Sequence, residues 1–145
     1  MANPKKQLIV YAEDDQDDIE LMEESFGNYA QNIELLCFSD GLEVYEYLAS
    51  SYNQPSPCLI VLDINLPRMS GKEVLKKLRA IKRFKDIPVV LFTTSSQPHD
   101  KAFAHFYGAG FMTKPITYKQ MDKIIHQFIE HCTDEIKNSI RKEFS

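Results

Sequence analysis

The feature that most constrains the fold is an alternation, repeated five times, between a short apolar segment and a longer amphipathic one. The apolar segments are rich in β-branched and aromatic residues and are apolar on both faces, as in strands buried within a parallel sheet. In the segments between them, apolar residues recur at spacings of three and four, which predicts helices with one buried face. We expect strands at residues 8–12, 33–38, 58–63, 89–93 and 111–113, with the last helix beginning near Thr117.

This alternation predicts an α/β fold in which helices cover both faces of a five-stranded parallel sheet. Right-handed crossover connections leave few topologies for such a chain, and the doubly wound (βα)5 sheet with strand order 2-1-3-4-5 is the natural candidate. The length of 145 residues suits one domain. We expect residues 1–145 to form that single domain, with a core at about 7–130 and a helical C-terminal extension at 131–145.

Composition and charge exclude several classes of protein. Hydrophobic residues make up 43% of the chain and charged residues 26%, which is typical of a globular domain rather than of a disordered chain. The net charge of −4 does not suit a nucleic-acid binder, and no apolar run is long enough for a signal peptide or a membrane span. Three scattered cysteines without CxxC spacing predict reduced thiols and therefore a cytoplasmic location.

Polar residues follow four of the five predicted strands at the edge where ligands bind in a sheet of this order. The carboxyl ends of parallel strands share one edge, and the binding crevice lies where the strand order reverses. The polar residues at this edge are Glu13 and Asp14 after the first strand, Asp63 at the end of the third, Thr93 at the end of the fourth and Lys114 after the fifth. The sequence therefore predicts that these five side chains form one site.

Three carboxylates at one edge require a cation. At about 5 Å and an effective dielectric constant near 20, each pair of carboxylates repels by roughly 3 kcal/mol. Lys114 alone cannot neutralise Glu13, Asp14 and Asp63, whereas a divalent cation could, and all-oxygen ligands select Mg²⁺ or Mn²⁺. Because phosphoryl transfer needs a nucleophile, a metal and positive groups, the cluster also suits phosphoryl transfer to the central carboxylate, Asp63.

These residues together resemble the CheY-like receiver domains of two-component response regulators. The resemblance covers about residues 7–130, and the ordered set of motifs is far more specific than any one of them. Asp63 precedes Thr93 by 30 residues and Lys114 by 51. The motifs are Glu-Asp-Asp at 13–15, Asp63 with Pro67 and Gly71 in D-x-x-x-P-x-x-x-G, Thr-Thr-Ser at 93–95 and Lys-Pro at 114–115.

The resemblance implies a flavodoxin-like fold and a metal-assisted phosphoacceptor site. Asp63 would be the residue that accepts the phosphoryl group. Mg²⁺ or Mn²⁺ would be bound by Glu13, Asp14, Asp63 and the backbone carbonyl of Asn65.

The resemblance also implies a conformational switch. Thr93 would be the hydroxyl that moves toward the phosphoryl group, and Lys114 would bind a phosphoryl oxygen. The peptide bond before Pro115 would be cis. Phe111 matches the aromatic residue that turns inward on activation, although it lacks the hydroxyl of a tyrosine.

At the level of function, the resemblance implies a stand-alone receiver that is not an enzyme beyond its own phosphorylation and dephosphorylation. Its donor would be a sensor histidine kinase or a histidine phosphotransfer protein, and its output an unknown downstream protein, with no nucleic-acid or membrane partner. One alternative is a phosphorylation-independent binding module with the same fold. Another is an enzyme with an aspartyl-phosphate intermediate, which would normally place an acid at the position of Asn65.

Three further patterns have simpler readings. Asp15, Asp17 and Asp18 are expected to favour the positive end of the first helix's dipole, with Asp15 as the N-cap. Four bases of the third helix, spaced by four, three and four residues, are expected to share a solvated face, or alternatively to dock an acidic partner; they are Lys72, Lys76, Arg79 and Arg83. The last helix carries an apolar stripe beyond Glu130, which predicts a homodimer or partner contact, or packing back onto its own domain.

Overall fold

A computed structural model describes residues 7–27, 33–50, 56–114, 120–121, 123–125 and 128 of the chain. The described strands form one parallel sheet of five strands in the order β2-β1-β3-β4-β5, as predicted. The order reverses between β1 and β3, so a crevice is expected at the carboxyl ends of these two strands. The strands are β1 (Gln7–Ala12), β2 (Ile33–Phe38), β3 (Leu59–Leu62), β4 (Val89–Thr93) and β5 (Gly110–Thr113).

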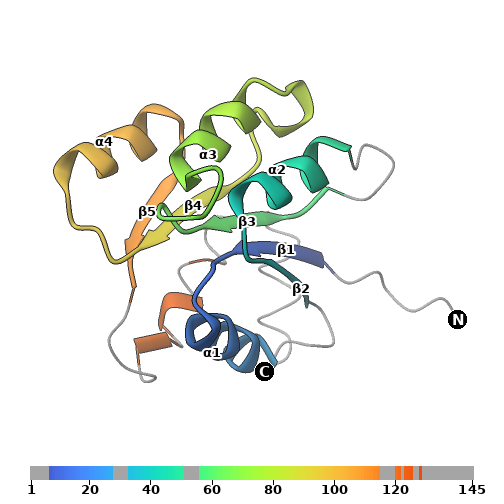
Figure 1. Cartoon of the computed structure of the whole chain (residues 1–145), viewed down its shortest axis with the longest axis vertical. Coiled ribbons are helices and arrows are strands. Elements are labelled where there is room, and N and C mark those ends of the chain that lie inside the picture. Colours follow the sequence, from blue (N-terminus) through green and yellow to red (C-terminus); the bar gives the residue numbers. More distant parts are fainter. Residues whose placement is uncertain are drawn as a thin grey trace, which may run out of the picture.

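Helices cover both faces of this sheet. Figure 1 shows α1 on one face and α2, α3 and α4 on the other, and the described helical residues between 120 and 125 lie on the side of α1. This arrangement confirms the predicted doubly wound fold. The helices described in full are α1 (Gln16–Phe26), α2 (Gly41–Ser50), α3 (Gly71–Arg79), the short 3₁₀ helix η2 (Lys82–Phe84) and α4 (Pro98–Phe106).

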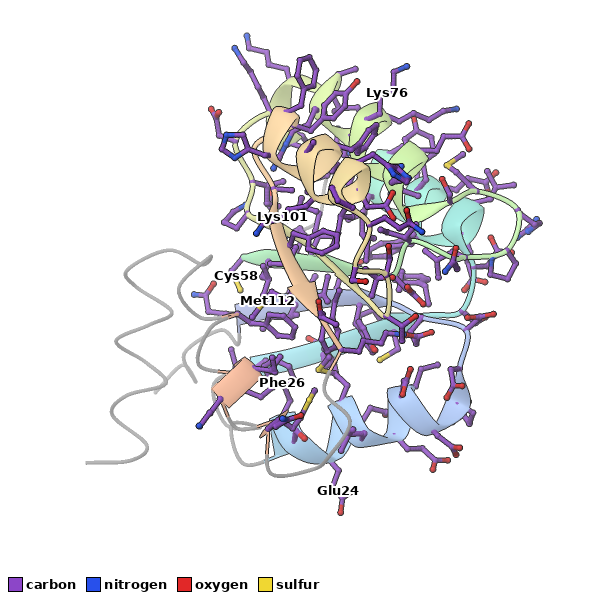
Figure 2. All side chains as sticks on the ribbon, turned by 90° about the vertical axis from the view of Figure 1, so that its left-hand side faces the viewer. Glu24, Phe26, Cys58, Lys76, Lys101 and Met112 are labelled. Atoms are coloured by element: carbon purple, nitrogen blue, oxygen red, sulfur yellow. The ribbon has the colours of Figure 1, made fainter. Side chains whose placement is uncertain are left out.

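The strands are buried on both faces because their side chains alternate between two apolar clusters. In β1, Ile9 and Tyr11 pack with residues of α1, whereas Val10 and Ala12 pack with residues of α2 and α3. Every residue of β3 and β4 is buried, which explains the continuous apolar runs in their sequences. The helices are one-sided: on α1, Phe26 points toward the sheet and Glu24 points away from it (Figure 2).

The prediction of a solvated basic face on the third helix is wrong for Arg79 and Lys72, which are half-buried. The guanidinium of Arg79 donates hydrogen bonds to four backbone carbonyls, and burial lowers its pKa. Arg83 donates to carbonyls at the end of α2, and Lys72 pairs with Asp100 of α4. Lys76 extends from α3 into solvent as expected (Figure 2), and Arg83, which lies in η2, is also exposed. The carbonyls bound by Arg79 belong to Phe84, Ile87, Tyr107 and Gly108.

Two predictions fall outside the described residues: the cis bond before Pro115, and the helical extension at 131–145 with its proposed contact. In the part of the chain that the structure describes, no helix has the length and apolar character needed to cross a membrane.

Candidate functional site

The carboxyl edge of the sheet brings Glu13, Asp63 and Lys114 into contact. The ammonium of Lys114 lies 3.1 Å from Oδ2 of Asp63 and forms an ion pair with Oε1 of Glu13. Backbone bonds fix this geometry, since the amide of Asp63 donates to the carbonyl of Ala12 (3.0 Å) and that of Lys114 to Thr93 (2.8 Å). The site therefore follows from where β1, β3, β4 and β5 end.

Asp14 completes a cluster of acids. One carboxylate oxygen from each of Glu13, Asp14 and Asp63 can be chosen so that all three lie within 4.8 Å of one another. Asp14 is exposed, whereas Glu13 and Asp63 are buried. The cluster has all-oxygen donors and an excess of negative charge over the single ammonium of Lys114, so it fits a divalent cation of the Mg²⁺ or Mn²⁺ type.

Glu13 is the most buried acid of the site, with an exposure of 1%. Burial raises the pKa of its carboxyl to about 7, because the opposing hydrogen bond from Lys114 is offset further by the negative charge of Asp63. The backbone amides of Asp14 and Asp15 donate to its Oε2 at 3.0 and 3.1 Å, which fixes the carboxylate in place. Its negative charge is therefore costly without a neighbouring cation.

Burial and the neighbouring carboxylates have opposite effects on the pKa of Lys114. Burial alone would lower its pKa, but hydrogen bonds to Glu13 and Asp18 and the charge of Asp63 raise the pKa above its usual value. The lysine is therefore a permanent cation within the site.

The structure adds Asp18 to the residues predicted from the sequence. Its Oδ2 lies 3.0 Å from the ammonium of Lys114. The predicted N-cap is confirmed, since Oδ1 of Asp15 accepts a hydrogen bond from the amide of Asp18 at 3.0 Å. The dipole reading of Asp18 was thus incomplete: the same helix start also directs this carboxylate toward the end of β5.

The backbone of Asp63 lies close to Gly71 at the start of α3. A Cβ atom added to Gly71, the first residue of α3, would lie 2.0 Å from the carbonyl oxygen of Asp63, so only glycine fits. The amide of Gly71 also donates to the carbonyl of Ile64 at 2.9 Å. This contact closes the loop that carries the exposed residue Asn65. It also explains the spacing of eight residues between Asp63 and Gly71.

Thr93 is fully buried at the end of β4 and belongs to a network that the sequence did not reveal. Its Oγ1 accepts a hydrogen bond from the amide of Ser95 at 3.3 Å, and the hydroxyl of Ser95 donates to Asp100 at 2.6 Å. Asp100 also accepts from Lys72 of α3 at 2.7 Å, and these two hydrogen bonds lower its pKa. The loop after β4 is thereby connected to both α3 and α4.

A surface hollow lies beside this loop, and Phe111 lies on the neighbouring strand β5. Phe111 is half-buried on β5 and packs against the apolar cluster beneath α2, α3 and α4. A hollow of about 490 Å³ lies between the loops after β3 and β4, where Asn65, Thr94 and Ser96 are among the lining residues. Most of its lining residues are polar, and two of them, Ile64 and Asn65, directly follow Asp63 in the chain.

The fold and the site define a receiver domain. The chain belongs to the response regulator receiver domain family, whose model matches residues 9–126. Receiver domains take phosphoryl groups from kinases and act on downstream targets in two-component systems, and this confirms the class that the sequence motifs predicted.

The chain is similar to several proteins of known identity. It is 33% identical over 128 residues to the response regulator Rcp1 of Synechocystis sp., and the match covers 86% of each chain. The crystal structure of the phosphorylated cyanobacterial phytochrome response regulator RcpA superposes with a TM-score of 0.79 at 29% identity, covering 89% of this chain and 98% of that one. The Mn²⁺-bound form of Rcp1 gives a TM-score of 0.78 at 31% identity, covering 88% and 97%.

Proposed function

We propose that Asp63 accepts a phosphoryl group from the phosphohistidine of a sensor histidine kinase or a histidine phosphotransfer protein. In this step a carboxylate oxygen of Asp63 bonds to phosphorus as the nitrogen–phosphorus bond of the donor breaks. Water later cleaves the acyl phosphate, which returns the carboxylate and releases inorganic phosphate. The observation that carries the proposal is the buried Asp63 carboxylate in contact with Lys114 and beside the carboxylates of Glu13 and Asp14.

The site residues divide this work. Glu13, Asp14, Asp63 and the backbone carbonyl of Asn65 would hold Mg²⁺ or Mn²⁺, which supplies positive charge to the phosphoryl oxygens. Lys114 would donate a hydrogen bond to one of these oxygens and neutralise part of their charge. The acidic cluster supports this metal role, as does the Mn²⁺-bound structure of the related Rcp1.

Thr93 would convert phosphorylation into a change of shape. Its Oγ1 accepts from Ser95, so the hydroxyl proton of Thr93 is available for a phosphoryl oxygen on Asp63. A movement of Thr93 would shift the loop attached to Ser95 and change the space available to Phe111. To move such a two-state equilibrium from 1:99 to 99:1, the phosphoryl group must favour one state by about 5.5 kcal/mol. A downstream protein would then read the altered surface.

The remaining parts of the proposal concern the surroundings of the receiver. We place it in the cytoplasm, which suits the reduced thiol of Cys37. The cis bond before Pro115 and a homodimer contact through the last helix also remain proposals, since both concern residues outside those described.

Intact mass after incubation with acetyl phosphate and Mg²⁺ tests the function. The wild-type chain is expected to gain one phosphoryl group and Asp63→Asn none, while the exposed acid Asp86, changed to Asn as a matched control, leaves labelling intact. Equal labelling of wild type and Asp63→Asn would refute the assignment of Asp63. A complete lack of labelling, together with no Mg²⁺-dependent binding of beryllofluoride, would favour the phosphorylation-independent binding module.

A further inference from the structure

The ammonium of Lys114 has one carboxylate for each of its hydrogen-bond donors. A lysine ammonium carries three N–H groups and no acceptor. Glu13, Asp18 and Asp63 each contribute one oxygen to it, and the lysine side chain is only 10% exposed. The direction of the ammonium is therefore set by three acceptors that come from different elements of the fold.

Two of these acceptors change partners during the proposed reaction, and the third does not. Asp63 would become the acyl phosphate, and Glu13 would turn its charge to the metal. Asp18 does not belong to the carboxylate cluster of Glu13, Asp14 and Asp63. Its carboxylate would therefore stay available to Lys114 at every stage.

Asp18 is held where a constant partner is needed. The N-cap bond from its amide to Asp15 fixes the first turn of α1, and the next residue, Ile19, packs into the apolar cluster on that face of the sheet. Asp18 and Lys114 both line a small cavity of about 20 Å³. The other lining residues besides Lys114 are Tyr11, Leu21, Phe92 and Met121.

From this geometry we infer that Asp18 is a positioning residue for phosphoryl transfer, which keeps the ammonium of Lys114 directed at the phosphoryl oxygens while Glu13 and Asp63 change partners. The inference rests on the proposed function of Asp63. It assigns Asp18 a role through Lys114 rather than through the metal or the phosphoryl group itself.

The neighbouring acid Asp17 provides a matched control. Asp17 lies in the same first turn of α1, carries the same charge and is exposed. An interaction with the helix dipole would be shared by Asp17 and Asp18, since both lie in that turn. The hydrogen bond to Lys114 belongs to Asp18.

The test compares the rate of phosphoryl uptake from acetyl phosphate, in which acetate leaves as phosphorus bonds to Asp63. At saturating Mg²⁺, Asp18→Ala is expected to slow uptake about fivefold, because an ion pair with a partly exposed carboxylate has a modest energy. Asp17→Ala is expected to match wild type. Mn²⁺ affinity, measured separately by titration, should be nearly the same in wild type and both variants. In a Lys114→Ala background, Asp18→Ala should cause no further loss.

Each other outcome overturns the inference. Equal rates for wild type and Asp18→Ala would show that the contact does not matter, and equal losses in the Asp17 and Asp18 variants would indicate a general effect of charge. A full loss from Asp18→Ala in the Lys114→Ala background would show that Asp18 acts independently of the lysine. If the wild-type chain takes up no phosphoryl group, the proposed function fails together with this inference, whereas labelling of wild type with unaltered Asp18→Ala rates removes the inference alone.

Discussion

The close approach between α3 and the backbone of Asp63 can be tested by changing Gly71 to alanine. The new Cβ would lie 2.0 Å from the carbonyl oxygen of Asp63, whereas ordinary contacts begin near 3.4 Å. The clash is with backbone, so no side chain can rotate away, and the start of α3 must move by more than an ångström. Overpacking of this kind costs up to about 3 kcal/mol, and we expect a loss of stability of that size.

Gly27 offers the matched comparison for the same substitution. It follows α1 with helical dihedral angles (φ −56°, ψ −30°), and a Cβ added there meets nothing within 4 Å. Gly27→Ala should therefore be neutral or stabilising by up to about 1 kcal/mol, through a lower entropy of the unfolded chain. Urea denaturation followed by circular dichroism measures both variants. Indistinguishable midpoints for the two would refute the packing account of Gly71.

Three further predictions follow from other parts of the structure. Arg79→Ala should lower the free energy of unfolding by about 3 kcal/mol, because it leaves buried carbonyls without their charged donor. In the same urea assay, Lys76→Ala on the exposed side of α3 should change the free energy of unfolding by less than about 0.5 kcal/mol. Because the pKa of Glu13 is raised to about 7, protons should compete with the metal for its carboxylate. Mn²⁺ affinity should therefore rise as the pH increases from 6 to 8, and Glu13→Gln should flatten this rise. A pH-independent affinity in the wild-type chain would contradict this prediction. The pKa of Asp100 is lowered in the folded protein, so its carboxylate stabilises the fold at pH values above its unfolded-state pKa. This stabilisation is lost as the pH falls through the lower folded-state pKa, and Asp100→Asn should therefore lose less stability than wild type in that range. Identical acid denaturation curves would argue against the hydrogen bonds from Lys72 and Ser95.

The sequence predicted the sheet well because the information is local. Strands buried on both faces must be apolar at every position, and the ends of β2 and β4 were predicted to the residue. The end of each parallel strand also has a fixed place in the fold, so strand order alone predicts that Glu13, Asp63 and Lys114 lie close together.

The missing contacts are those that no local pattern determines. Asp18 and Lys114 are 96 residues apart, and a carboxylate in the first turn of a helix already has a sufficient local explanation in the helix dipole. Helical periodicity placed Arg79 with the exposed bases, but it cannot show that η2 and the end of α4 bring free carbonyls to that side chain. The bonds that join Asp100 to Ser95 and to Lys72 of α3 likewise have no local signature in the sequence.

The proposed role of Asp63 as the phosphoacceptor is tested most directly by locating the phosphoryl group on the chain. After incubation with acetyl phosphate and Mg²⁺, reduction with borohydride converts an aspartyl phosphate into homoserine, which peptide fragmentation by mass spectrometry assigns to one residue. Homoserine is expected at position 63 alone. Homoserine at Asp14 or at another acid, with Asp63 unchanged, would contradict it.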